Sequence, residues 1–142
     1  MGRRDVGRAL VIGAALSLCS ASAVAVAPGS AVKATTAIEP GQWLVRERGA
    51  KTGGRSLCLR DASGFFQMRH PGAQCSRFVV ANEATRATVH YTCPGAGHGR
   101  TTLTVETPHS ITVETQGIAS GMPFQDEYQI RRVGGCTPGR SR

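Results

Sequence analysis

The stretch CSRFVVANEATRATVHYTC, residues 75–93, decides the fold. Side chains alternate in character on both sides of its polar centre, 82–86, as they do in two antiparallel strands that each bury one face. Keeping like side chains together gives four facing pairs: Cys75 and Cys93, Arg77 and Tyr91, Val79 and Val89, and Ala81 and Ala87. The stretch therefore predicts a β-hairpin whose open end is closed by two cysteines.

Five further segments outside this hairpin have the character of strands, and no amphipathic helix accompanies them. These segments are 42–48, 55–60, 99–106, 110–116 and 124–133. Short strands separated by turns rich in Gly and Pro are typical of an antiparallel meander. The sequence therefore predicts an all-β fold, a single curved antiparallel meander sheet of about seven strands that forms an open half-barrel or a small barrel.

The register of the fifth and sixth strands follows from a turn at 107–109. This turn places Val105 opposite Ile111 and Leu103 opposite Val113, while threonines and glutamates point the other way. Such a division predicts a sheet with one dry face and one wet face.

Two connections are expected to be irregular. The first is 61–72, where Asp61 can cap a short helical turn that Gly64 weakens. The second is 117–123, between the last two strands.

The chain begins with the pattern of an export signal. Residues 1–25 combine three arginines near the start with an uncharged run over 9–19 and small residues that offer cleavage after Ala23 or Ala25. The apolar run is too short to span a bilayer, which takes roughly 20 residues. A lipoprotein anchored through Cys19 is the alternative, but Leu18 precedes it where lipoprotein processing requires a small side chain. We expect a periplasmic or secreted protein with no transmembrane span in its mature chain.

The remaining sequence divides into three parts. Residues 26–37 are small, polar and without periodicity, so they are expected to be flexible. Residues 38–136 form the β domain, and 137–142 are expected to be a disordered tail.

Four cysteines, Cys58, Cys75, Cys93 and Cys136, follow the signal segment. An even number in an exported chain favours two disulfides, and no C-x-x-C spacing supports a zinc site. Because the hairpin places Cys75 opposite Cys93, we prefer that bridge together with Cys58 to Cys136. The main rival pairs Cys58 with Cys75 and Cys93 with Cys136.

The chain is basic, with a formal net charge of +8. Its basic residues are dispersed singly, apart from adjacent pairs such as Arg131 and Arg132, and no basic stripe alternates with stacking aromatics. Nucleic acid is therefore not an expected partner. Anionic envelope polymers or lipid head groups are an alternative partner for this charge.

No catalytic, cofactor-binding or metal-binding residue is predicted. The histidines His70, His90, His98 and His109 lack the spacing of a chelating pair. Asp126 and Glu127 are neighbours in one strand and so point to opposite faces, unlike a working acid and base. Glycines over 95–99 resemble a phosphate loop, but no helix follows them.

One face of the predicted sheet is a possible binding face. It carries the residues Trp43, Val79, Val89, Leu103 and Val113. These side chains can pack a core or receive a hydrophobic ligand or protein partner. We therefore expect a non-enzymatic exported envelope protein, with an unrecognised periplasmic enzyme as an alternative.

A resemblance supports this expectation. The chain has Pro40-Gly41-x-Trp43, then Cys58-Leu59, Cys75 before one strand, Cys93 at the end of the next, and Gly134-x-Cys136. In this order it resembles a family of small proteobacterial periplasmic proteins grouped under a domain of unknown function. The resemblance implies export and a β-rich fold over 39–136. It brings no catalytic residues, and the chain lacks the family's methionine-rich loops, keeping only Gly121-Met122-Pro123.

Overall fold

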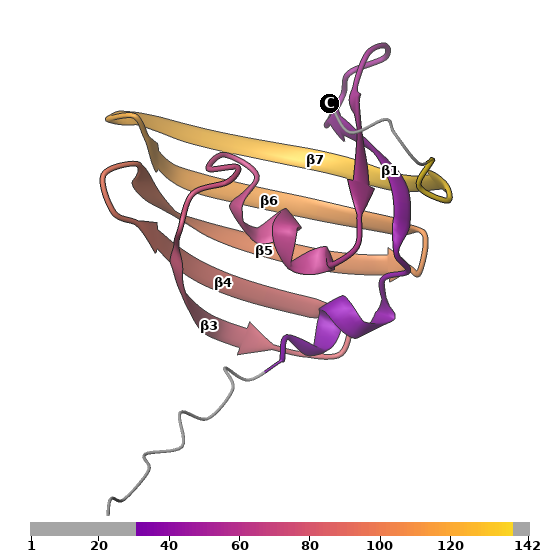
Figure 1. Ribbon diagram of the computed structural model, residues 1–142, viewed down its shortest axis with the longest axis horizontal. Helices are drawn as coiled ribbons and strands as arrows, with labels where there is room; N and C mark the ends of the chain where they lie inside the picture. Colours follow the sequence, from indigo (N-terminus) through magenta and orange to yellow (C-terminus); the bar gives the residue numbers. More distant parts are fainter. Residues whose placement is uncertain (1–30, 138–142) are drawn as a thin grey trace, which may run out of the picture.

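The computed structural model describes residues 31–137 and shows one open antiparallel sheet (Figure 1). The predicted signal segment and residues 138–142 of the predicted tail lie outside the described residues. The elements in chain order are the 3-10 helix η1 (Lys33–Ala37), strands β1 (Gly41–Glu47) and β2 (Arg55–Leu59), the 3-10 helix η2 (Ala62–Gln67), and strands β3 (Ser76–Asn82), β4 (Arg86–Cys93), β5 (Gly97–Thr107), β6 (Ser110–Ala119) and β7 (Met122–Gly134).

The seven strands lie in the order β2-β1-β7-β6-β5-β4-β3, which confirms the predicted fold class. Strands β3 to β7 form the expected meander. The hairpin of β1 and β2, however, lies beside β7, at the end of the chain, and not beside β3. Strands β2 and β3 are therefore the two edges of the sheet, and η2, which connects them, crosses its concave face (Figure 1).

The hairpin of β3 and β4 keeps most of its predicted register. Val79 pairs with Val89, and Arg77 pairs with Tyr91. The predicted pairing of Ala81 with Ala87 is wrong, because a β-bulge after Val79 shifts the register by one residue and brings Ala81 opposite Thr88. The strands also continue closer to the turn than expected, to Asn82 and from Arg86.

The β5–β6 register is as predicted, with Leu103 opposite Val113 and Val105 opposite Ile111. The loop predicted over 117–123 is wrong. Strand β6 continues to Ala119 and β7 begins at Met122, so only Ser120 and Gly121 form the turn. Both have the positive φ of a tight hairpin turn, 50° and 77°.

The core lies on the concave face, under the two short helices. Asp61 caps η2 by accepting a hydrogen bond from the Ser63 amide, and the helix turns Phe65 and Phe66 into the core. The Phe65 ring meets Trp43 edge to face, with centroids 5.9 Å apart. Most of 61–67 is therefore ordered helix where an irregular loop was expected.

The segment before β1 also contributes to the core. Residues 33–37, part of the stretch expected to be flexible, form η1, and Ala34 of this helix is fully buried. The Lys33 amide donates a hydrogen bond to Asn82 Oδ1, which ties η1 to the edge strand β3.

The two preferred disulfides are present. Cys75 and Cys93 close the β3–β4 hairpin, with Cα atoms 4.2 Å apart. Cys58 joins Cys136, so edge strand β2 is linked to the chain just after β7, with Cα atoms 5.4 Å apart. Each bridge therefore fastens one edge of the open sheet.

Candidate functional site

The predicted binding face is the interior of the protein. Trp43, Val89, Leu103 and Val113 are at most 1% exposed, and Val79 is half-buried against the same cluster. Of the two roles expected for this face, it packs the core, because the chain's own η1 and η2 cover it and Phe65 and Phe66 fill it. The side chains of the sheet that a ligand can reach lie on its outer, convex face.

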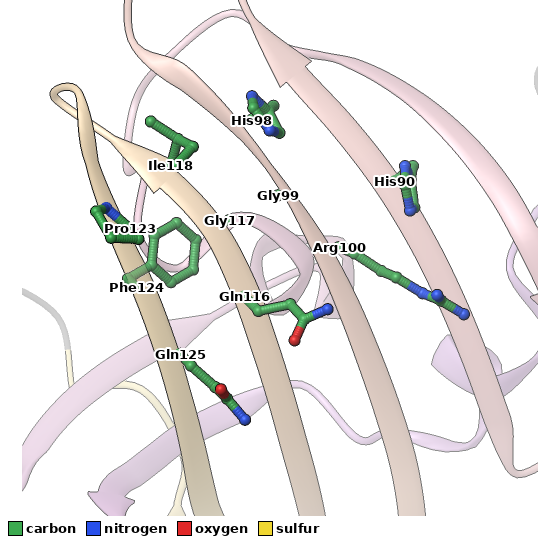
Figure 2. Close-up of a pocket in the computed structure, with 10 residues that line it drawn as sticks. All are labelled: His90, His98, Gly99, Arg100, Gln116, Gly117, Ile118, Pro123, Phe124 and Gln125. Atoms are coloured by element: carbon green, nitrogen blue, oxygen red, sulfur yellow. The ribbon is translucent and has the colours of Figure 1, made fainter.

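Four neighbouring strands present a row of polar side chains on the outer face. The register places Arg100 of β5 beside His90 of β4 on one side and Gln116 of β6 on the other. Gln116 in turn lies beside Gln125 of β7. Figure 2 shows these side chains projecting from the sheet on the side away from η2.

A second row, one step nearer the ends of the strands, adds apolar walls. His98 pairs with Ile118, and Ile118 pairs with Pro123. Together with Phe124 the two rows surround a shallow groove of about 700 Å³ (Figure 2).

Two facing glycines form the floor of this outer groove. Gly99 of β5 pairs with Gly117 of β6, and neither can carry a larger side chain. A Cβ on Gly99 would lie 2.5 Å from the Tyr91 hydroxyl, and a Cβ on Gly117 would collide with the His98 carbonyl. Close packing of Tyr91 and of the neighbouring backbone therefore requires glycine at both positions, and the bare backbone of the two strands lies at the bottom of the groove.

The charged side chain that lines the outer groove is Arg100, with the imidazoles of His90 and His98 near it. Within residues 31–137, Arg100, His90 and His98 make no side-chain hydrogen bond or ion pair, and no carboxylate lines the 700 Å³ groove. An adjoining depression of about 500 Å³ shares Arg100 and extends to Asp126, whose partner is Arg69, and to two glutamates. Those glutamates already have cationic partners, so the guanidinium of Arg100 is left free to receive an anion.

Each of those two glutamates lies next to an arginine. The Glu114 carboxylate lies 3.9 Å from the Arg86 guanidinium, and Glu127 forms an ion pair with Arg48. Arg86 and Arg100 thus project from neighbouring strands on the same face, one with a carboxylate partner and one without.

The concave side holds a buried histidine at the same end of the sheet. His70 is 5% exposed, with Nδ1 3.1 Å from the Tyr91 hydroxyl and Nε2 3.1 Å from the Ala96 carbonyl oxygen. Burial raises the pKa of Tyr91, so its hydroxyl keeps its proton and can donate to the ring. Both ring nitrogens are therefore used to fasten the segment after η2 to the β4–β5 turn.

Next to this histidine lies a partly exposed ion pair. The Asp126 carboxylate is 3.3 Å from Nε of Arg69, whose guanidinium stacks over Phe124 at 5.1 Å from the ring centre. Burial and the neighbouring Asp126 raise the pKa of Tyr128. Glu127 has a different partner, Arg48.

The last histidine belongs to a surface cluster. His109 Nε2 lies 2.9 Å from a Glu39 carboxylate oxygen, and this contact, with help from Arg132, lowers the pKa of Glu39. Within the described residues no three side chains of His, Cys, Asp or Glu gather as a metal site. No helix in that part of the chain is long and apolar enough to cross a membrane.

Comparisons with protein-family models, with curated protein sequences and with solved structures gave no match. The resemblance to the periplasmic family therefore stays a prediction.

Sequence reasoning missed the outer groove for an identifiable reason. Alternation already places His90 and Arg100 on the outer face. Because the sequence predicts a loop over 117–123, it does not place Ile118 and Pro123 in the sheet beside His90 and Arg100. A glycine in β5 that faces a glycine in β6 was the available signal of a close approach.

Proposed function

We propose that this chain is an exported, non-enzymatic binding protein whose outer groove binds anionic groups of envelope molecules, such as phosphate or carboxylate. The observation that carries the proposal is the unpaired Arg100 between His90 and the amide of Gln116. A guanidinium presents donors in a fork that matches a carboxylate or phosphate. Imidazole and amide groups on both sides supply further donors.

The chemistry of the lining supports binding over catalysis. The groove contains one arginine, two imidazoles and two amide side chains together with Ile118, Pro123 and Phe124. It has no serine, threonine, cysteine, lysine or carboxylate, and within residues 31–137 neither His90 nor His98 has the hydrogen-bonding partner that orients a catalytic imidazole. The proposal replaces the apolar ligand expected on the concave face, because that face is filled.

Export rests on two independent features. The first is the basic and apolar pattern of residues 1–25. The second is the pair of disulfides, which are compatible with an extracellular or periplasmic location.

A matched pair of charge deletions tests the proposal. We expect Arg100→Gln to weaken binding of inorganic polyphosphate at least about tenfold, since a charge-assisted hydrogen bond contributes about 1.5–3 kcal/mol. Arg86→Gln removes the same charge from the same face, where Glu114 already occupies the guanidinium, and should change affinity less than about threefold. Isothermal titration calorimetry at low salt measures both. Equal losses would show that net charge, and not the outer groove, is responsible.

A further inference from the structure

The outer groove ends at an uncharged tip formed by two hairpin turns. The β4–β5 turn and the β6–β7 turn lie side by side at one end of the sheet, at the left of Figure 1. The Ser120 amide donates a hydrogen bond of 3.2 Å to the Ala96 carbonyl oxygen and joins them. We call residues 94–97 and 118–123 the hairpin end.

The hairpin end contains no charged residue, and it exposes an apolar side chain. Its sequence is PGAG in one turn and IASGMP in the other. Met122 is 69% exposed, and Ile118 and Pro123 beside it are the apolar walls of the outer groove. Met122 does not belong to the core cluster, so packing in the core does not account for its apolar side chain.

An imidazole and an arginine without a carboxylate partner in the described chain lie directly behind this apolar tip. His98 is opposite Ile118 in the register, and Arg100 is two residues further along β5. An anion in the outer groove would therefore lie next to Ile118 and Pro123. The position of Arg100 behind these apolar side chains matches a bilayer surface, where charged head groups meet the beginning of the acyl chains.

The other end of the sheet has a different character. The β3–β4 turn carries Glu83 and is followed by Arg86, and the β5–β6 turn is preceded by Glu106. Placing those carboxylates against an anionic surface would be unfavourable. Of these two ends of the sheet, the hairpin end is the one that combines an uncharged tip with a nearby arginine that has no carboxylate partner in the described chain.

We propose that the hairpin end docks on a bilayer that carries anionic lipids, with Met122 at the acyl boundary and a lipid phosphate beside Arg100. This proposal rests on the proposed function, because it names the molecule that supplies the anion. The charge complementarity between the Arg100 guanidinium and anionic head groups selects the partner, and the exposed methionine selects a bilayer over a dissolved polymer.

Vesicle sedimentation tests the docking with the purified, oxidised protein. We expect binding to phosphatidylcholine vesicles that contain one third phosphatidylglycerol and much weaker binding to pure phosphatidylcholine. Met122→Ser should reduce partition onto the mixed vesicles about fivefold or more, since burial of a methionine side chain is lost. The same variant should bind dissolved polyphosphate as the unaltered protein does.

Two controls separate the two proposals. Val133→Ser removes another exposed apolar side chain, 55% exposed near the far end of β7 from Met122, and should leave vesicle binding unchanged. Arg100→Gln should reduce binding to vesicles and to polyphosphate alike. Polyphosphate binding that depends on Arg100, without vesicle binding or with an unaffected Met122→Ser variant, would overturn the docking and leave the proposed function standing. Failure to bind either would overturn both.

Discussion

The two faces of the sheet have similar alternating patterns but meet different surroundings. On the concave face, Leu103 and Val113 are fully buried beneath η1 and η2. On the convex face, no element of the described chain crosses the sheet, and His98 and Arg100 are exposed without partners. The difference shows that the elements packed over a sheet, more than the side chains of the sheet itself, decide which face a ligand can reach.

The largest expected effect is on the free energy of unfolding, when a side chain of η2 that covers the concave face is shortened. Phe65 is fully buried against Trp43, so Phe65→Ala should lower the free energy of unfolding by about 3–5 kcal/mol. Phe78→Ala removes the same ring from the convex face and should cost less than about 0.5 kcal/mol. Urea denaturation measures both. Similar losses would mean that η2 does not seal the concave face.

A smaller effect is expected from charge placed on the two faces of one strand. Val105 is 8% exposed on the concave face, so Val105→Asp should cost about 3 kcal/mol, because the carboxylate is buried or forced to neutralise. Thr104 lies on the convex face, with its hydroxyl 3.4 Å from an Arg86 guanidinium nitrogen, and Thr104→Asp should cost under about 1 kcal/mol. A reversed order in thermal unfolding would contradict the assigned faces of β5.

The smallest effect concerns the cap that starts η2. Hydrogen bonds from Ser63 lower the pKa of Asp61, so its ionised form is favoured by folding. This contribution is present at neutral pH and is lost as the pH falls below about 4, through the lower pKa of the folded state. Asp61→Ala should cost about 1 kcal/mol at pH 7.

The pH dependence of the stability difference shows whether the ionised Asp61 carboxylate is responsible for the loss, or whether any change of this side chain would cause it. The difference in stability between Asp61→Ala and the unaltered chain should shrink on acidification, as measured by urea unfolding at several pH values. A difference that stays constant down to about pH 2 would show that the carboxylate charge does not matter.

Much of the fold follows from the sequence because strands and turns leave local patterns. Alternation and turn residues predicted the all-β class and the register of Val105 with Ile111. The facing positions of Cys75 and Cys93 in one hairpin were enough to select the correct pairing of disulfides. Each of these features depends on residues that are close in sequence or joined by one turn.

The parts that the sequence did not reveal depend on contacts between distant segments. The pairing of β1 with β7 joins the two ends of the domain, and no local pattern announces it. Phe65 and Phe66 lie in a segment with a glycine and no periodicity, yet they fill the concave face. The outer groove could not be predicted for the same reason, since it requires the register of four strands together.

The most direct test of the account asks which face binds an anion. We would follow backbone amide signals by nuclear magnetic resonance while inorganic polyphosphate is added to the isotope-labelled protein. The account predicts shifts concentrated at residues 98–100 and 116–118, with little change at Trp43 and Phe65. Shifts at Trp43 and Phe65 with an unchanged convex face would contradict it.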